Sequence, residues 1–163
     1  EDARDVWERA LRNNPWDPNN LASYGHGFWD GKPQDRDKAY HCITRALDLL
    51  EWLEKPGRKN EQRKEMWSGW LTSWLEHEPY MLVRNEHYGK ARRWVRRAVE
   101  DRPDNPIVLA AAAVYHQRMT NETRASFYED RATNALARLA GDERETCEKN
   151  PRWHWLAGEL SNK

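Results

Sequence analysis

Small and apolar residues recur at helical spacing in four segments of the chain. Each segment has Ala first, an apolar residue four positions later, Arg two positions after that, and then two small or apolar residues. The segments are residues 3–11, 39–47, 91–99 and 132–140. Offsets of zero, four, seven and eight fall on one stripe of an α-helix, so the pattern predicts four helices. Four of the alanines are expected to be nearly fully buried where helices touch: Ala39, Ala46, Ala91 and Ala98.

The Arg of each segment lies at the shoulder of the predicted buried face. An aliphatic stem can lie there on apolar surface while the charged head stays wet. We expect at least two of the four to be partly buried, each with a carboxylate or carbonyl partner on an adjacent helix. They are Arg9, Arg45, Arg97 and Arg138.

A second set of stripes alternates with the first. Runs that begin at Leu21, Trp67 and Leu109 carry aromatic, apolar or small residues, with one His, at offsets that share one helical face. No alternating strand pattern is present. The predicted helices lie near residues 2–13, 18–30, 36–53, 60–78, 86–101, 106–118, 121–140 and 143–161, with a break in the last at Pro151.

Three short motifs predict where helices begin. Asp17-Pro18, Asn105-Pro106 and Asn150-Pro151 each place a capping side chain before a proline. The Asp or Asn accepts from free backbone N–H groups, and a proline at the first helical position loses nothing by lacking one. Gly141-Asp142, followed by Glu145, predicts a helix stop and a restart that resembles a capping box.

The composition predicts a folded chain with large polar faces. Of 163 residues 33% are charged, and 27 Lys plus Arg balance 27 Asp plus Glu. Ten Trp and six Tyr supply apolar surface that a disordered chain lacks. The length fits one domain, and the high ratio of surface to core favours an elongated one. Zero net charge argues against a chain-wide attraction for nucleic acid but leaves room for local patches.

Neither the cysteines nor the chain start assigns a compartment. Cys42 and Cys147 leave two alternatives, buried thiols or one long-range bridge. No apolar run has the length of a membrane-spanning helix, so we expect a soluble chain. The sequence begins at Glu1 without Met or a signal-like segment, as in a processed protein or a fragment. The oligomeric state stays open.

Parts of the pattern resemble a known repeat family. The face of Leu21, Tyr24, Gly25 and Phe28, followed by Ala39, Ile43 and Ala46, resembles a tetratricopeptide repeat (TPR). Residues 3–11 also resemble the second helix of a half-a-TPR repeat of RNA-processing proteins. The motif alanines are 36, 52 and 41 residues apart, against about 34 in the standard repeat, so the array would be divergent.

The resemblance implies an all-α fold, a TPR-like α-α superhelix (solenoid) of about seven to eight antiparallel helices. It would form a single helical repeat domain over residues 1–163. The divergent repeats would lie near residues 1–17, 18–53, 60–103 and 106–140, with a C-terminal capping helix at 143–161.

In TPR-like arrays the first helix of each pair lines a concave face that binds peptides or partner helices. The resemblance places these residues on that groove: Asn19, Ser23, His26, Trp29, Glu65, Thr72, Glu76, Gln117 and Arg118. The alternative is that they are ordinary solvated positions and that the contact lies on an edge or an insert. At helical spacing Trp67, Trp70 and Trp74 indicate core, whereas Trp16, Trp29 and Trp52 are candidates for exposed interface anchors.

The densest basic run lies on the predicted helix 86–101. Arg93, Arg96 and Arg97 can share the face opposite its apolar stripe. One interpretation is a patch that binds phosphates or acids. The favoured alternative is a solvated face whose arginines pair with nearby Glu and Asp.

We predict no catalytic, cofactor or metal site. His77, Glu78, Glu86 and His87 gather bases and carboxylates, but not at the spacing of a zinc-binding helix. A charged loop after a Trp-rich helix is the simpler account. We therefore expect a non-enzymatic scaffold, adaptor or assembly factor that binds a protein partner, as a peptide or a helix, through the groove or the inserts. The alternative is a half-a-TPR-like subunit of an RNA-processing complex, with RNA the less favoured partner.

Overall fold

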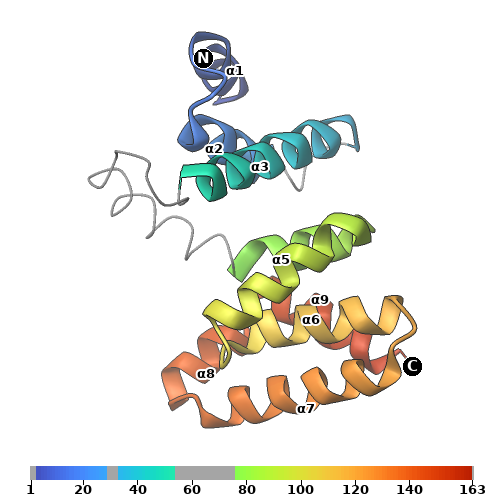
Figure 1. Cartoon of the computed structure of the whole chain (residues 1–163). Coiled ribbons are helices and arrows are strands. Elements are labelled where there is room, and N and C mark those ends of the chain that lie inside the picture. Colours follow the sequence, from blue (N-terminus) through green and yellow to red (C-terminus); the bar gives the residue numbers. More distant parts are fainter. Residues whose placement is uncertain (1–2, 29–32, 54–75, 163) are drawn as a thin grey trace. The chain divides into compact units, whose positions relative to one another are not determined.

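The computed structural model describes residues 3–28, 33–53 and 76–162 (Figure 1). These residues form α-helices joined by turns and caps, and no strand occurs among them, which confirms the all-α prediction. The chain divides into two compact units, Glu1–Leu71 and Thr72–Lys163. A single domain over the whole chain stays a prediction.

The first unit contains α1 (Ala3–Asn13), α2 (Pro18–Phe28) and α3 (Pro33–Leu53). α2 packs along α3, and α1 packs on α2 (Figure 1). The predicted stripes supply the core, because the apolar face of α2 meets the alanine stripe of α3. The buried residues include Leu21, Tyr24, Ala39, Ile43, Ala46 and Leu47.

In the described part of the second unit, the helical residues 76–84 are followed by five further helices. These are α5 (Tyr88–Asp101), α6 (Pro106–Arg118), α7 (Glu122–Arg138), α8 (Gly141–Glu148) and α9 (Pro151–Ser161). α6 packs against α5, α7 and α9. Every residue from Pro106 to Tyr115 is buried, because a helix that is apolar all round has no face suited to water. α6 is therefore the centre of this unit.

All three predicted Asp-Pro or Asn-Pro starts are confirmed. The Asp17 carboxylate accepts from the Asn19 backbone N–H at 2.8 Å. Asn105 Oδ1 accepts from Ile107 and Val108, and Asn150 Oδ1 accepts from Arg152. The break of the last predicted helix at Pro151 is confirmed as well, since α8 and α9 are separate helices.

Two predicted boundaries are wrong. α8 starts at Gly141 with Ala140 as its N-cap and no side-chain cap, so Asp142 lies inside the helix instead of capping it. The segment after residue 78 was expected to be a charged loop, yet residues 76–84 are helical through Pro79. Tyr80, Met81, Leu82 and Val83 are all buried, and the burial of this apolar run outweighs the proline's poor fit to a helix.

The alanine prediction is confirmed, and it leads to a stability prediction. Ala39, Ala46, Ala91 and Ala98 are each 0% exposed. Ala98→Leu should overpack the contact between α5 and its neighbours and lower the free energy of unfolding by about 1–3 kcal/mol. Ala137→Leu on the exposed side of α7 is the matched control and should stay within about 0.5 kcal/mol of the parent. Urea titrations of both variants, followed by Trp fluorescence, check this; equal midpoints would contradict it.

The arginine prediction is wrong. Arg9, Arg45 and Arg138 are exposed, and only Arg97 is half-buried. Arg45 shows the reason, because its guanidinium lies 3.8 Å from the ring centroid of Trp16, which is itself 62% exposed. A long side chain stacks on an aromatic at the surface and avoids the entropic and desolvation costs of lying beneath a neighbouring helix.

Candidate binding site

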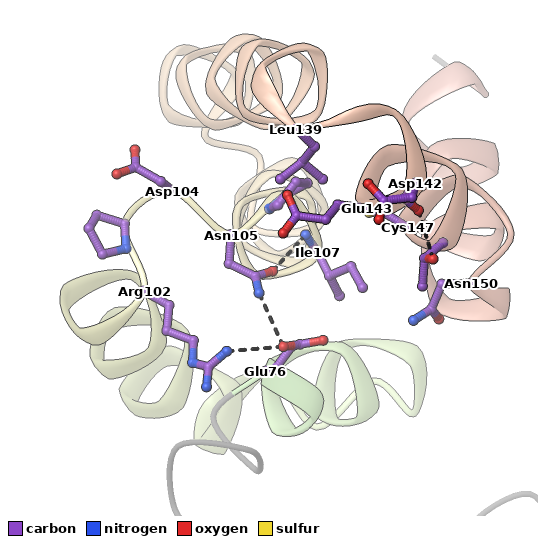
Figure 2. Close-up of a pocket in the computed structure, with 13 residues that line it drawn as sticks. Glu76, Arg102, Asp104, Asn105, Ile107, Leu139, Asp142, Glu143, Cys147 and Asn150 are labelled. Atoms are coloured by element: carbon purple, nitrogen blue, oxygen red, sulfur yellow. Dashed lines mark hydrogen bonds and ion pairs between the residues drawn. The ribbon is translucent and has the colours of Figure 1, made fainter. Parts of the chain in front are cut away.

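The turn between α5 and α6 is tied to the helical residues 76–84 by one carboxylate. Arg102 Nη1 donates to Glu76 Oε2 at 3.1 Å, and Asn105 Nδ2 donates to the same oxygen at 3.1 Å. Asn105 uses its other amide atom to cap α6. Figure 2 shows the Glu76 carboxylate between these two partners. The cluster fixes one side of a pocket.

The pocket has a volume of about 660 Å³ and lies within the second unit. The α5–α6 turn, the start of α6, the end of α7 and α8 all contribute to it. It is lined by Glu76, Arg102, Pro103, Asp104, Asn105, Pro106, Ile107, Leu139, Asp142, Glu143, Thr146, Cys147 and Asn150. Its apolar part comes from Ile107, Leu139 and the prolines, and its size is typical of a ligand site.

Negative charge dominates the described lining. Glu76 is neutralised by Arg102, the cation among the lining residues. Asp142 and Glu143 are exposed and lie near Leu139, away from Arg102, in Figure 2, whereas Asp104 points outward from the rim. Within the described part of the chain, no ion pair or hydrogen bond reaches the carboxylates of Asp104, Asp142 or Glu143. Such a surface attracts a cation.

Cys147 is the thiol of this pocket. Its thiol is half-buried and forms no disulfide. Cys42 of the first unit forms no disulfide either, and it is buried. Burial raises the pKa of the Cys147 thiol, and the carboxylates of Glu76 and Glu148 raise it further. Reactive cysteines need positive surroundings that favour the thiolate, so these surroundings do not make Cys147 a nucleophile.

α9 packs on two elements of the second unit, α6 and the helical residues 76–84. Trp155 meets Tyr80 edge-on with 5.5 Å between ring centroids, and Glu159 forms an ion pair with Arg118 at the end of α6. Leu156 and Leu160 are buried. α8 buries no residue and connects α7 to α9.

The predicted groove residues are divided between the two units and the part of the chain that the structure does not describe. Asn19 and Ser23 are half-buried on α2, in the first unit. Glu76 lines the pocket at the start of α6. Gln117 and Arg118 lie at the other end of α6. The described residues do not include Trp29, Glu65 or Thr72. The side chain of His26 also lies outside the description.

Glu76 was predicted as a groove residue, whereas the pocket carboxylates of Asp104, Asp142 and Glu143 were not predicted as part of a site. Asp104 and Asp142 each lie one or two residues from a predicted helix boundary. That position was the available signal, because turns at the same end of a helical bundle are brought together by packing. Spacing along the chain cannot show which turns meet.

The arginines of the predicted basic patch interact with other side chains of their own helix, α5. The guanidinium groups of Arg93 and Arg97 lie 5.2 and 5.9 Å from the ring centroid of Trp94. Arg96 pairs with Glu100 one turn later at 3.7 Å. This arrangement favours the solvated face over a phosphate site. Trp16 and Trp52 are exposed, as predicted, whereas Trp29, Trp67, Trp70 and Trp74 lie outside the described residues.

Among His77, Glu78, Glu86 and His87, Glu78 is the buried titratable group. It is 1% exposed, and no hydrogen-bond partner for its Oε1 exists among the described residues. Burial without a compensating charge raises the pKa of this carboxyl to about 8. Glu78 is therefore mostly protonated at neutral pH, because the apolar surroundings disfavour the carboxylate.

Comparisons of the chain with models of protein families, with curated proteins and with solved structures find no match. Among the described residues no helix is both long and apolar enough to cross a bilayer. In the same part of the chain, no three His, Cys, Asp or Glu side chains are grouped so that they could hold a metal ion.

Proposed function

We propose that this chain is a TPR-like helical module that binds a partner protein, and that the pocket of its second unit receives a basic segment of that partner. The helical arrangement supports the first part. The helical residues 76–84 precede α5 across a short turn, α6 precedes α7 in the same way, and α6 packs against α5. Ala98 and Ala132 are buried where such pairs would touch.

The second part, that the pocket receives a basic segment, rests on carboxylates without ion pairs beside an apolar floor. Ile107 is buried in the floor, while Asp142 and Glu143 stand at the rim without ion pairs in the described chain. A Lys or Arg side chain combines an aliphatic stem with a cationic head, so it can satisfy both surfaces at once. The volume of about 660 Å³ has room for such a side chain and its neighbours.

Nothing in the described residues favours RNA as the partner. The pocket repels phosphates, because its net charge is negative. The three arginines of the predicted basic patch, Arg93, Arg96 and Arg97, already contact Trp94 or Glu100. The RNA-processing alternative would therefore need another surface.

A peptide-display experiment tests the pocket. Random peptides displayed on phage are selected on the whole chain, and the enriched peptides are then measured for Kd. We expect Lys or Arg beside apolar residues in the enriched peptides. Asp142→Lys/Glu143→Lys should weaken their binding about tenfold or more, because attraction becomes repulsion. Added salt should also weaken binding to the parent.

The matched control is Glu122→Lys/Asp130→Lys, which makes the same charge change on the exposed side of α7 and should leave the Kd within about twofold. Two results would contradict the proposal. One is that no peptide is enriched, or that both double variants weaken binding equally. The other is that the chain binds single-stranded RNA in a salt-sensitive way and that Asp142→Lys/Glu143→Lys leaves this binding unchanged. The RNA would then occupy another surface, in favour of the RNA-processing alternative.

A further inference from the structure

α8 forms a wall of the pocket without burying any residue of its own. Asp142, Glu143, Thr146 and Cys147 line the pocket, yet no α8 residue is buried. Its ion pair between Arg144 and Glu148 lies within the helix and does not attach it to a neighbour. α8 is joined to α9 through a two-residue turn. α8 is joined to α7 by a link of the same length and packs on both helices, so the position of this wall depends on where α7 and α9 lie.

α9 is attached through one face. Arg152 Nη1 lies 3.4 Å from His77 Nε2, Trp155 meets Tyr80, and Glu159 pairs with Arg118. Leu156 and Leu160 are buried beside these groups, whereas His154 and Gly158 are exposed. Contacts at intervals of three or four residues are the pattern by which an amphipathic helix lies in a groove.

The attachment is small compared with the burial of α6. Two residues of α9 are buried, whereas α6 is buried continuously from Pro106 to Tyr115. Elements with few buried apolar contacts open first in native proteins. α9 should therefore leave the rest of the unit more readily than α6 does.

We propose that α9 is a displaceable helix whose place is taken by an amphipathic helix of a partner protein with the pattern Trp-Leu-x-x-Glu-Leu of residues 155–160. The partner's acidic residue pairs with Arg118, and its aromatic residue packs on Tyr80. Displacement frees the end of α8 that is joined to α9, so this wall of the pocket is then held by α7 alone. The proposal rests on the proposed function of that pocket, to which it adds a regulator.

Thermodynamic linkage sets the direction of this regulation. A helix that displaces α9 lowers the affinity of the pocket for a basic segment, and a bound basic segment opposes displacement by the same factor. A second copy of this chain should not displace α9. Its α9 offers identical contacts, while the tethered α9 has the advantage of a high effective concentration.

Hydrogen exchange of the whole parent chain is the first test. We expect backbone amides of residues 154–161 to exchange about tenfold or more faster than those of residues 110–116. Exchange of both segments at one rate would make α9 an integral part of the fold and overturn the proposal. This measurement needs no variant, so it decides even if a substitution in α9 prevents folding.

A labelled peptide of residues 150–162 is the second test. It should bind the whole-chain variant Leu156→Ala about tenfold or more tightly than the parent, because the weakened α9 competes less. The peptide carrying Glu159→Lys should lose binding, and Arg118→Glu in the chain should restore it. Absence of binding to Leu156→Ala, or no restoration by the charge swap, would overturn the proposal. So would a stable dimer of the parent formed by exchange of α9.

Cys147 reports the movement of α8. Saturating peptide should raise its alkylation rate in Leu156→Ala several-fold, because the half-buried thiol becomes accessible, while the buried Cys42 should not change. An unchanged Cys147 rate with bound peptide would show that α8 stays in place, against the proposal. None of these readouts uses a basic peptide, so failure of the pocket to bind one is seen separately.

Discussion

Glu78→Gln is expected to stabilise the chain at alkaline pH and to remove one steep component of its pH dependence. In the folded chain the pKa of Glu78 is raised from 4.5 to about 8. Below pH 4.5 the carboxyl is protonated in both folded and unfolded chains, so its favourable contribution is fully present. Between pH 4.5 and 8 only the folded chain holds the proton, and stability falls as pH rises. Above pH 8 the loss is complete.

Gln keeps the shape of the protonated carboxyl and cannot ionise. At pH 9 the variant should therefore exceed the parent in free energy of unfolding by an amount on the order of a few kcal/mol, since each pKa unit corresponds to about 1.4 kcal/mol. At pH 4.5 the two should be similar. Urea titrations followed by Trp fluorescence at intervals from pH 4 to 9 measure the difference.

The control is Glu122→Gln, which changes an exposed carboxyl in the first turn of α7. Its stability curve should run parallel to that of the parent across the whole range. A Glu78→Gln curve that is also parallel would show that Glu78 is ionised in the folded chain, and it would contradict the burial of this carboxyl without a charge partner.

Gly25→Ala is expected to force α2 and α3 apart. A Cβ at this position would lie 2.2 Å from Ile43 Cγ1 and 3.1 Å from the carbonyl oxygen of Ala39. Both neighbours belong to the buried stripe of α3, so neither can move without disturbing the core. We expect a loss of about 1–3 kcal/mol in the free energy of unfolding, the usual range for overpacking.

Gly27→Ala is the matched control, since it lies in the same helix with nothing within 4 Å of the added carbon. It should stabilise the chain by up to about 1 kcal/mol through helix propensity alone. Ile43→Ala removes the clashing atoms, so Gly25→Ala should cost clearly less in that background. Equal unfolding midpoints for Gly25→Ala and Gly27→Ala would contradict the close approach of the two helices.

Local signals in the sequence were enough to locate most helices and their buried faces. Asp17, Asn105 and Asn150 cap the helices that they were predicted to start. The repeated alanines are buried because their spacing matches the turn of a helix. These features depend on residues within a few positions of one another, so a single sequence contains all the information needed.

Tertiary packing decided the features on which the proposals depend. Glu76 meets Arg102 and Asn105 across more than twenty residues of chain, and Glu159 meets Arg118 across about forty. The sequence alone does not distinguish Glu78 from an exposed glutamate. Only burial by the surrounding residues raises its pKa. A helix pattern states which face is apolar but not which neighbour covers it. Pairing of turns, docking of α9 and burial of a carboxyl therefore arise from long-range contacts that are selected by the free energy of the whole unit.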